Sequence, residues 1–347
     1  MSDYFISQVR PDDQNALSQI DLLLQQEGLC RDANLDYICA MYDDAYRIIA
    51  TGSCFANTLR CFAVSNAHQG EGLLNELVSH LVDVQYRRGI IHLFLYTKVS
   101  SAKYFRDLGF YPIAQVDDSL VFMENRKNGF SQYLNQLSQT KKEGRSAALV
   151  MNANPFTLGH QYLAEKAAAR CDALHLFIVS EDVSLVPFTV RKKLVLEGTA
   201  HLPNVICHDS GPYIISNATF PSYFLKDEEA VIRNHAKLDL MIFSQIARAL
   251  SITCRYVGEE PNSQVTGIYN QIMAEHLPKE GIDCVILPRK EAGGKPISAS
   301  DVRRLLQEDK LQELGGLVPA STLKYFQSKE GAAVLERIRQ AENVIHY

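Results

Sequence analysis

Residues 146–163 constrain the fold of this chain more than any other stretch. The apolar run at 147–151 predicts a buried strand. Asn152, Asn154 and Pro155 then interrupt the pattern and predict a turn, after which apolar residues recur at helical spacing. The stretch therefore predicts a strand, a turn and a helix. The N-terminus of such a helix presents N–H groups and a positive dipole end that suit phosphate.

The turn of this unit carries side chains suited to a phosphate ester. Thr157 offers a hydroxyl, and His160 offers an imidazole donor for developing negative charge. Gly159 has no Cβ, so a nucleotide can approach the backbone closely. The alternative is that Gly159 only packs the helix against the strand and that His160 is an ordinary polar residue.

A second segment, residues 297–303, has the sequence ISASDVR. Ser298 to Asp301 has the form of a capping box before the apolar positions of a helix. Arg303 supplies a planar fork that suits phosphate oxygens, although by position alone it could be a surface arginine. Capping and phosphate binding are compatible, because both use the first turn of a helix.

These two segments resemble the T/H-x-G-H and I-S-x-S-x-x-R/K signatures of the nucleotidyltransferase superfamily, in the same order. The resemblance implies adenylyl transfer from ATP with Mg²⁺. It implies catalytic roles for His160, Thr157 and Arg303. We expect ATP contacts at Asn154, Pro155, Phe156, Gly159, Ser298, Ser300 and Glu259, and we assign no metal ligands.

Length and charge limit the classes of protein that this chain can belong to. Its 347 residues are enough for two domains. A formal net charge of −5 provides no basic field, so we expect no nucleic-acid partner. The eight cysteines form no C-x-x-C pair, which favours reduced thiols over a disulfide framework or a structural zinc site. No apolar run reaches membrane-spanning length, so we expect a cytoplasmic protein with no membrane association.

Residues 1–125 predict a first, α+β domain. We expect helices at 12–29, at about 74–87 and at 101–108, and strands at 37–41, 46–54, 59–64 and 90–96. The glycine turn at Gln69, Gly70 and Gly72 opens the second of these helices, as a backbone cradle for a pyrophosphate would.

This first domain resembles the GNAT acetyltransferase family in its glycine turn and in the segment from Ala102 to Phe110. The family pattern has a small residue where this chain has Leu74, which is a departure in the pyrophosphate loop. The resemblance implies a thiol or coenzyme-A-like ligand at Gln69, Gly70 and Gly72. Tyr104 is then a candidate general acid to a thiolate, or else a packed aromatic side chain. A domain that kept the fold and lost transferase chemistry is an equally open alternative.

A polar segment at 126–145 predicts a linker with a short helix at 130–137, followed by a second domain at 146–347. In the second domain strands and helices alternate, which predicts a Rossmann-like parallel sheet with ligands at the carboxyl ends of its strands. Polar groups follow four of the expected strands, at 152–160, 180–182, 258–260 and 288–290. Overall we expect an α/β protein: a GNAT-like α+β domain and a Rossmann-like nucleotidyltransferase domain.

Two nucleotide-binding classes do not fit this sequence. Residues 293–295 read GGK but are followed by Pro296, so the chain has no P-loop. Class I aminoacyl-tRNA synthetases share an H-x-G-H element, but this chain lacks their K-M-S-K-S loop and is acidic.

The whole chain resembles the citrate lyase ligase family. The resemblance rests on MNANPFTLGHQYL (151–163), SGPYIISNATFPSYFLK (210–226), RYVGEEP (255–261) and PISASDVR (296–303). It implies an acid–thiol ligase that forms an acetyl-adenylate from ATP and acetate. It then transfers the acetyl group to the thiol of the citrate lyase acyl carrier subunit, on a prosthetic group derived from dephospho-coenzyme A. AMP and diphosphate are the other products.

Two alternatives to this function stay open. An adenylyltransferase of the pantetheine-phosphate or nicotinamide-nucleotide type would keep AMP attached to a phosphate acceptor. A non-catalytic sensor of ATP or acyl-CoA would bind ligands without turnover, although it would have no need of the transition-state groups at Thr157, His160 and Arg303.

Overall fold

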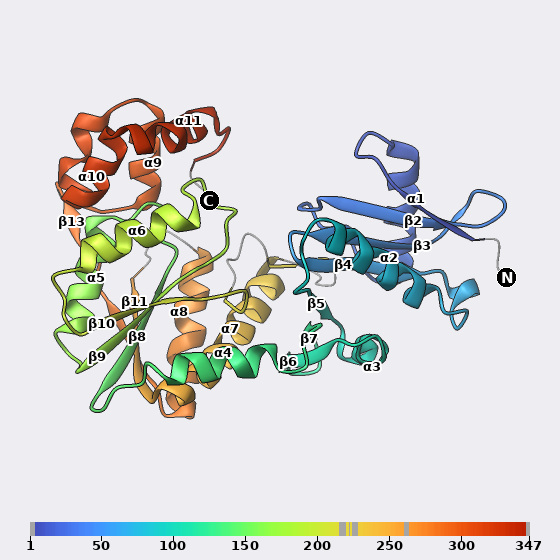
Figure 1. Ribbon diagram of the computed structural model, residues 1–347, viewed down its shortest axis with the longest axis horizontal. Coiled ribbons are helices and arrows are strands. Elements are labelled where there is room, and N and C mark those ends of the chain that lie inside the picture. Colours follow the sequence, from blue (N-terminus) through green and yellow to red (C-terminus); the bar gives the residue numbers. More distant parts are fainter. Residues whose placement is uncertain (1–3, 215–219, 222, 224–227, 260–263, 345–347) are drawn as a thin grey trace. The chain divides into compact units, whose positions relative to one another are not determined.

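The chain is described from a computed structural model, which covers residues 4–214, 220, 221, 223, 228–259 and 264–344 (Figure 1). It divides into two compact units, each described by itself. The N-terminal unit comprises Met1–Gln132 and Thr219–Met241, and the C-terminal unit comprises Tyr133–Ala218 and Ile242–Tyr347. The chain therefore leaves the C-terminal unit after its first part and returns to it later.

In the described part of the N-terminal unit the strands form a seven-stranded sheet in the order β1-β2-β3-β4-β5-β7-β6. The strands are β1 Phe5–Gln8, β2 Tyr37–Tyr42, β3 Ile48–Phe55, β4 Thr58–Val64, β5 Phe94–Thr97, β6 Tyr111–Val116 and β7 Leu120–Glu124. Neighbouring strands are antiparallel except β4 and β5, which pair in parallel over Thr58↔Phe94 and Leu59↔Leu95. The helices are α1 Gln14–Gln26, α2 Leu73–Arg87 and α3 Ala102–Asp107, with short 3₁₀ turns η1 Asn66–His68 and η2 Val99–Ser101.

Helix α2 shows why this sequence forms these elements. Its apolar residues recur every three or four positions, and Leu73, Leu77, Val78 and Leu81 are all buried in the core beneath the sheet. Gly72 caps the helix in the left-handed conformation, with φ of 84°. The three helices predicted for this region are confirmed. Strands β1, β6 and β7 were not predicted from the sequence, because they are short and their apolar periodicity is brief.

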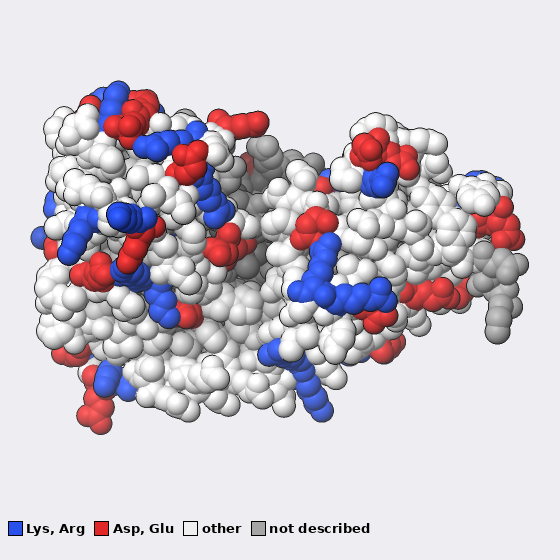
Figure 2. Space-filling view, turned by 45° about the horizontal axis from the view of Figure 1, so that its top comes forward, with Lys and Arg blue, Asp and Glu red and all other residues white. Residues whose placement is uncertain are grey.

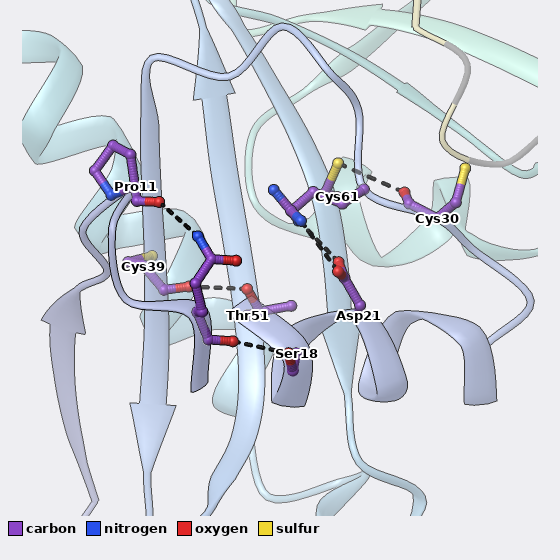
Figure 3. A network of polar contacts seen from close by, with 9 residues as sticks. Pro11, Ser18, Asp21, Cys30, Cys39, Thr51 and Cys61 are labelled. Atoms are coloured by element: carbon purple, nitrogen blue, oxygen red, sulfur yellow. Dashed lines mark hydrogen bonds and ion pairs between the residues drawn. The ribbon is translucent and has the colours of Figure 1, made fainter. Parts of the chain in front are cut away.

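Polar contacts join β2 to β3, α1 to the loop that follows it, and that loop to β4 (Figure 3). The Thr51 hydroxyl donates to the Cys39 carbonyl at 2.9 Å, which links β3 to β2 by a side chain. The Arg31 guanidinium lies 2.8 Å from the Asp21 carboxylate on α1. The Cys61 thiol points toward the Cys30 carbonyl at 4.0 Å. The eight cysteines, all within the described residues, are free thiols.

Residues from the middle of the chain complete the N-terminal unit. Tyr223 donates its hydroxyl to the Tyr96 carbonyl on β5 and accepts from the Cys30 N–H at 2.7 Å. Phe220 meets the Tyr96 ring edge-on, with centroids 5.7 Å apart. Aromatic packing and main-chain bonds therefore join this segment to the sheet.

The described part of the C-terminal unit contains a five-stranded sheet in the order β10-β9-β8-β11-β12, in which every pairing is parallel. The strands are β8 Ser146–Met151, β9 Ala173–Ile178, β10 Val205–Asp209, β11 Ile252–Gly258 and β12 Asp283–Leu287, and a hairpin adds β13 Glu291–Ala292 and β14 Lys295–Pro296. The helices are α5 Leu158–Ala168, α6 Phe188–Thr199, α8 Gln264–His276, α9 Ala299–Gln307, α10 Ala320–Gln327 and α11 Ala332–Gln340. The 3₁₀ turns are η3 Leu277–Glu280, η4 Leu311–Gly316 and η5 Lys329–Gly331. Helices α4 Gly129–Ser138 and α7 Glu228–Leu250 carry residues of both units.

This sheet is covered by helices in the way that the alternating pattern predicts. Helix α5 packs against β8, β9 and β11, while α8 packs against β12. The α/β fold class, with a parallel sheet in the C-terminal region, is therefore confirmed. Helices α10 and α11, and the hairpin, were not predicted. Because all five strands run in one direction, the segments after β8, β9, β11 and β12 lie along one edge of the sheet.

Lys and Arg side chains are interspersed with Asp and Glu on the face shown in Figure 2. Several form exposed ion pairs, such as Lys192 with Asp209 and Arg304 with Asp301. Within the described residues, no helix is both long enough and apolar enough to span a bilayer.

Candidate active site at the carboxyl end of β8

Thr157 and His160 form a reciprocal cap at the start of α5. The Thr157 hydroxyl oxygen accepts from the His160 N–H at 3.3 Å, and the His160 Nδ1 accepts from the Thr157 N–H at 3.1 Å. This is the geometry of a capping box, with histidine in the place usually taken by glutamate or glutamine. Thr157 is 1% exposed, so its hydroxyl is committed to this cap.

The cap determines which nitrogen of His160 carries the proton. Because Nδ1 accepts from a main-chain N–H, the neutral ring holds its hydrogen on Nε2. Burial, followed by the positive charges of Arg289 and Arg303, lowers the pKa of His160 to about 4. The ring is therefore a neutral Nε2–H donor at pH 7, which suits developing negative charge on a phosphoryl oxygen.

The second predicted segment lies beside the first. A Cβ added to Gly159 would lie 3.4 Å from the Ile297 carbonyl oxygen, which is ordinary contact. Ser298 caps α9 by accepting from the Ser300 N–H at 3.1 Å. The predicted capping box at Ser298–Asp301 is wrong in one respect, because the Asp301 carboxylate pairs with Arg304 at 2.9 Å.

Arg303 is buried where the two segments meet. Its guanidinium donates to the Asn154 carbonyl, to the Val344 carbonyl at 2.6 Å and to the Ser300 hydroxyl at 3.1 Å. The residue is 2% exposed, and burial lowers the pKa of Arg303 to about 10, so the side chain remains charged at pH 7. It therefore contributes positive potential beneath the turn while holding the turn in place.

Asn154, Pro155 and Phe156 form the frame of the turn. The Asn154 side chain accepts from the Val186 N–H at 3.0 Å, and the peptide bond to Pro155 is cis. The Phe156 carbonyl accepts from the buried Thr322 hydroxyl on α10 at 3.1 Å. All three side chains are buried, so their observed contacts are with the protein.

Arg191, on α6, was missed by the sequence analysis. It is fully buried and donates to five oxygen atoms, on Val186, Val179, Glu181 and twice on Asn152. Burial lowers its pKa to about 10. Arg191 therefore ties the turn after β8 to the loop after β9. The available signal was an arginine on the same helix face as the buried Leu194 and Val195.

Three further groups lie along the same edge of the sheet. Ser210, after β10, accepts from the Ser180 N–H at 2.9 Å. Glu259 follows β11 with an exposed side chain, and its N–H donates to the Leu287 carbonyl at 2.8 Å. Arg289, after β12, is partly buried and close enough to His160 to lower the pKa of that imidazole. Glu260 and Pro261 lie outside the described residues.

The candidate thiol-binding residues belong to the N-terminal unit. Gln69, Gly70 and Gly72 share the loop before α2, where the glycines have φ of 89° and 84° and no atom lies within 4 Å of an added Cβ. The Gln69 side chain donates to the Asn66 side-chain oxygen at 2.9 Å. Tyr104, on α3, is 51% exposed, with the Lys103 ammonium 4.8 Å from its ring. The structure thus brings the loop residues together and leaves Tyr104 at the surface.

A comparison with protein families matches residues 146–326 to the C-terminal domain of citrate lyase ligase. Curated relatives named [citrate [pro-3S]-lyase] ligase span most of the chain. The protein of Klebsiella pneumoniae is 42% identical over 88% of this chain and 91% of its own length. That of Escherichia coli K12 is 38% identical over 96% of this chain and 95% of its own length.

Solved structures similar to the N-terminal region include GNAT acetyltransferases. A GNAT-family acetyltransferase from Staphylococcus aureus Mu50 covers 35% of this chain and 99% of its own, with 12% identity and a TM-score of 0.30. Escherichia coli ElaA covers 36% of this chain and 100% of its own, with 14% identity and a TM-score of 0.30.

Identity of about two residues in five over nearly the whole length confirms the resemblance noted in the sequence. The site built from Thr157, His160 and Arg303 lies inside the matched region. The chain belongs to the citrate lyase ligase family, a family of ligases.

Proposed function

We propose that this chain uses ATP to acetylate the thiol of the citrate lyase acyl carrier subunit, and that it works in the cytoplasm, where ATP is its energy source. One observation carries the proposal. The two segments expected to bind ATP meet at the carboxyl end of β8, beside a neutral histidine whose pKa is lowered by burial and by two arginines. The names of the relatives supply citrate lyase as the acceptor, and the thiol of its acyl carrier subunit is what the resemblance noted in the sequence implies.

The proposed reaction has two steps. An acetate oxygen attacks the α-phosphorus of ATP, the bond to the bridging oxygen breaks, and diphosphate leaves. The thiol sulfur of the carrier's dephospho-coenzyme-A-derived group then attacks the acetyl carbon. The carbon–oxygen bond to AMP breaks, and the thiol proton passes to solvent. Adenylation makes this second step possible by turning a poor leaving group into a good one.

The residues of the site divide the first step between them. His160 is placed to donate from Nε2 to a phosphoryl oxygen as charge develops, and Thr157 positions that ring through the cap. Gly159 leaves the start of α5 open to the nucleotide. Arg289 and Arg303 provide positive potential for the triphosphate, while Arg303 also holds the turn. Ser298 and Ser300 lie at the N-terminus of α9, and Ser300 accepts a hydrogen bond from Arg303, so we propose that they contact the same phosphates.

Mg²⁺ enters this proposal with ATP. Among the residues that the structure describes, no three or more His, Cys, Asp or Glu side chains gather as a metal-binding group. In nucleotide-dependent enzymes Mg²⁺ usually keeps several waters and is bound by substrate phosphates with one or two carboxylates. The ion supplies charge neutralisation to the departing diphosphate.

The glycine loop of the N-terminal unit is proposed to bind a coenzyme-A-like ligand through its pyrophosphate. The support is the open space beside Gly70 and Gly72 at the N-terminus of α2. Gln69 borders this space. Tyr104 stays a candidate general acid to a thiolate, on an exposed side chain.

The proposal is tested by following ATP labelled in the γ-phosphate and in adenine, with Mg²⁺, acetate and thiol-form citrate lyase, omitting each in turn. We expect free AMP and diphosphate only when acetate and the lyase are both present, with acetyl on the carrier. His160→Ala should keep ATP binding within about tenfold and lose about 10²–10³ in turnover. AMP attached to a phosphate acceptor would instead indicate an adenylyltransferase, and ATP binding without cleavage would indicate a sensor.

A further inference from the structure

A cavity of about 410 Å³ lies in the C-terminal unit between α4, β10 and the first turns of α6. Its wall includes Tyr133 and Gln136 from α4, Lys192 from α6, and Cys207, His208 and Asp209 from β10. The volume is within the range of about 300–1,000 Å³ that is typical of small-molecule sites. None of these residues belongs to the proposed adenylation site.

The charges in this wall are satisfied by one another. The Lys192 ammonium lies 2.8 Å from the Asp209 carboxylate, and the Tyr133 hydroxyl donates to the Asp209 carbonyl at 3.1 Å. Burial raises the pKa of Cys207, so its thiol stays protonated. The wall therefore offers hydrogen-bonding groups with no net charge to attract an anion.

The histidine of the wall is also neutral. The imidazole of His208 is hydrogen-bonded to that of His175, which is buried one strand further in, with Nε2 to Nδ1 at 2.9 Å. Burial lowers the pKa of each ring to about 4. A neutral chain that combines amides with alkyl groups fits such a wall better than acetate or a phosphate does.

The place of the cavity in the sheet indicates which substrate it serves. The proposed triphosphate groups follow β8 and β12, on one half of the sheet order, while β10 is the edge strand of the other half. Parallel strands lie about 4.8 Å apart, so the ends of β8 and β10 are separated by about 10 Å. Ser180 and Ser210 lie at the strand ends between them. The cavity and the proposed adenylation site therefore lie at the same edge of the sheet, two strands apart.

We infer that this cavity holds the pantetheine arm of the acyl acceptor, with the arm's thiol directed along the sheet edge toward β8. A pantetheine arm is a neutral chain of two amides that ends in a thiol, which matches the chemistry of the wall. The inference rests on the proposed function, in which that thiol attacks the acetyl carbon, releases AMP and loses its proton to solvent.

The first test separates the two half-reactions in the full-length enzyme. Acetate-dependent exchange between ATP and labelled diphosphate reports adenylation, while acetylation of thiol-form citrate lyase reports the second step. Gln136→Trp fills the cavity from an exposed position on α4, and Asn135→Trp is the control at the neighbouring exposed position, outside the cavity wall.

Gln136→Trp should lower kcat/KM for the carrier at least tenfold, as a loss confined to the thiol half-reaction, and Asn135→Trp should change neither rate by more than twofold. Carrier acetylation by Gln136→Trp at the unmodified rate would overturn the inference. Absence of acetate-dependent exchange in the unmodified chain would instead contradict the proposed function itself.

A second test uses the Cys207 thiol as a reporter and needs no variant. Alkylation of Cys207 by N-ethylmaleimide is followed by mass spectrometry with and without S-methylpantetheine, which occupies the arm's place but has no free thiol. We expect at least fivefold slower alkylation of Cys207, with no change at the exposed Cys30. Equal rates with and without the probe would show that the arm does not enter this cavity.

Discussion

The guanidinium of Arg303 donates a hydrogen bond to the main-chain carbonyl of Asn154, 149 positions earlier in the chain. The same side chain donates to the Val344 carbonyl near the C-terminal end of the described residues. One buried arginine thus joins the turn after β8, helix α9 and the segment at Val344. Its charge is held beneath the turn proposed to bind ATP.

Arg303→Lys tests this connection. An ammonium cannot reproduce the planar fork, so at least one buried carbonyl loses its donor, at a cost of about 1–3 kcal/mol in the free energy of unfolding. We expect urea unfolding to show this loss and diphosphate exchange to fall more than tenfold. Arg304→Lys is the control, because Arg304 makes an exposed pair with Asp301 and should change stability by less than about 0.5 kcal/mol. Equal effects of the two substitutions would contradict the role given to Arg303.

Thr157→Val tests whether the hydroxyl positions His160. The change keeps the shape of the side chain and removes the oxygen that accepts from the His160 N–H, which should cost about 1 kcal/mol of stability. The Thr157 hydroxyl oxygen also lies 2.9 Å from the His160 Nδ1, so the imidazole loses one of its two links to residue 157. We therefore expect kcat for exchange to fall about tenfold or more with little change in KM for ATP. Thr157→Ser retains the oxygen and should keep most of the activity. A serine variant as slow as the valine variant would argue against the cap as the cause.

Gly159→Ala separates a ligand role from a packing role. An added Cβ meets the Ile297 carbonyl oxygen at 3.4 Å and nothing closer, so the fold accommodates alanine. If the glycine leaves room for ATP, the variant should unfold like the unmodified chain but show a KM for ATP raised at least tenfold. An unchanged KM would remove Gly159 from the nucleotide site.

Gly198→Ala, unlike Gly159→Ala, should lower stability, because the added Cβ disturbs packing. Its added Cβ would lie 2.3 Å from the Phe156 ring, which is fully buried and cannot move aside without shifting the turn. We expect a loss of about 1–3 kcal/mol in stability, measured by urea unfolding. Gly267→Ala is the matched control, because that helical position on α8 has open space around it. It should leave stability unchanged or raise it by up to about 1 kcal/mol.

As the pH falls, buried histidines should destabilise the folded chain at pH values above those at which most carboxylates become protonated. Burial lowers the pKa of His160, His175 and His208 to about 4 in the folded protein, against about 6.5 when unfolded. Between these values the unfolded chain binds more protons. The stability from these groups is therefore complete above pH 6.5 and is lost as the pH falls toward 4, at up to about 1.4 kcal/mol per pH unit for each group.

Urea unfolding at pH 7.5, 6.0 and 5.0 measures this loss, and NMR of the imidazole nitrogens reports each titration. His201, which is exposed beside Glu165, is the internal control. A His160 ring that titrates near pH 6.5, or that carries its proton on Nδ1, would contradict the capped neutral form.

The sequence by itself determined most of the elements around the candidate site and the edge of the sheet at which that site lies. The helical spacing of apolar residues predicts α2, because it places them on one buried face. The apolar run at 147–151 predicts β8, because almost the whole strand is buried. The alternation of strands and helices after residue 146 implies a parallel sheet, and a parallel sheet brings its strand ends to one edge. The positions of Thr157, Gly159 and His160 at that edge follow from local pattern alone.

Only the tertiary structure decided what those side chains touch. Arg191 and Arg303 donate mostly to main-chain oxygens, some of them distant in sequence, and the sequence does not show which carbonyl groups will accept. The same holds for the return of residues 219–241 to the N-terminal unit, where Tyr223 bonds to Tyr96. The pKa of His160 also depends on burial and on arginines from two other segments. Periodicity and motif spacing describe one segment at a time, whereas these contacts exist only once distant segments are packed together.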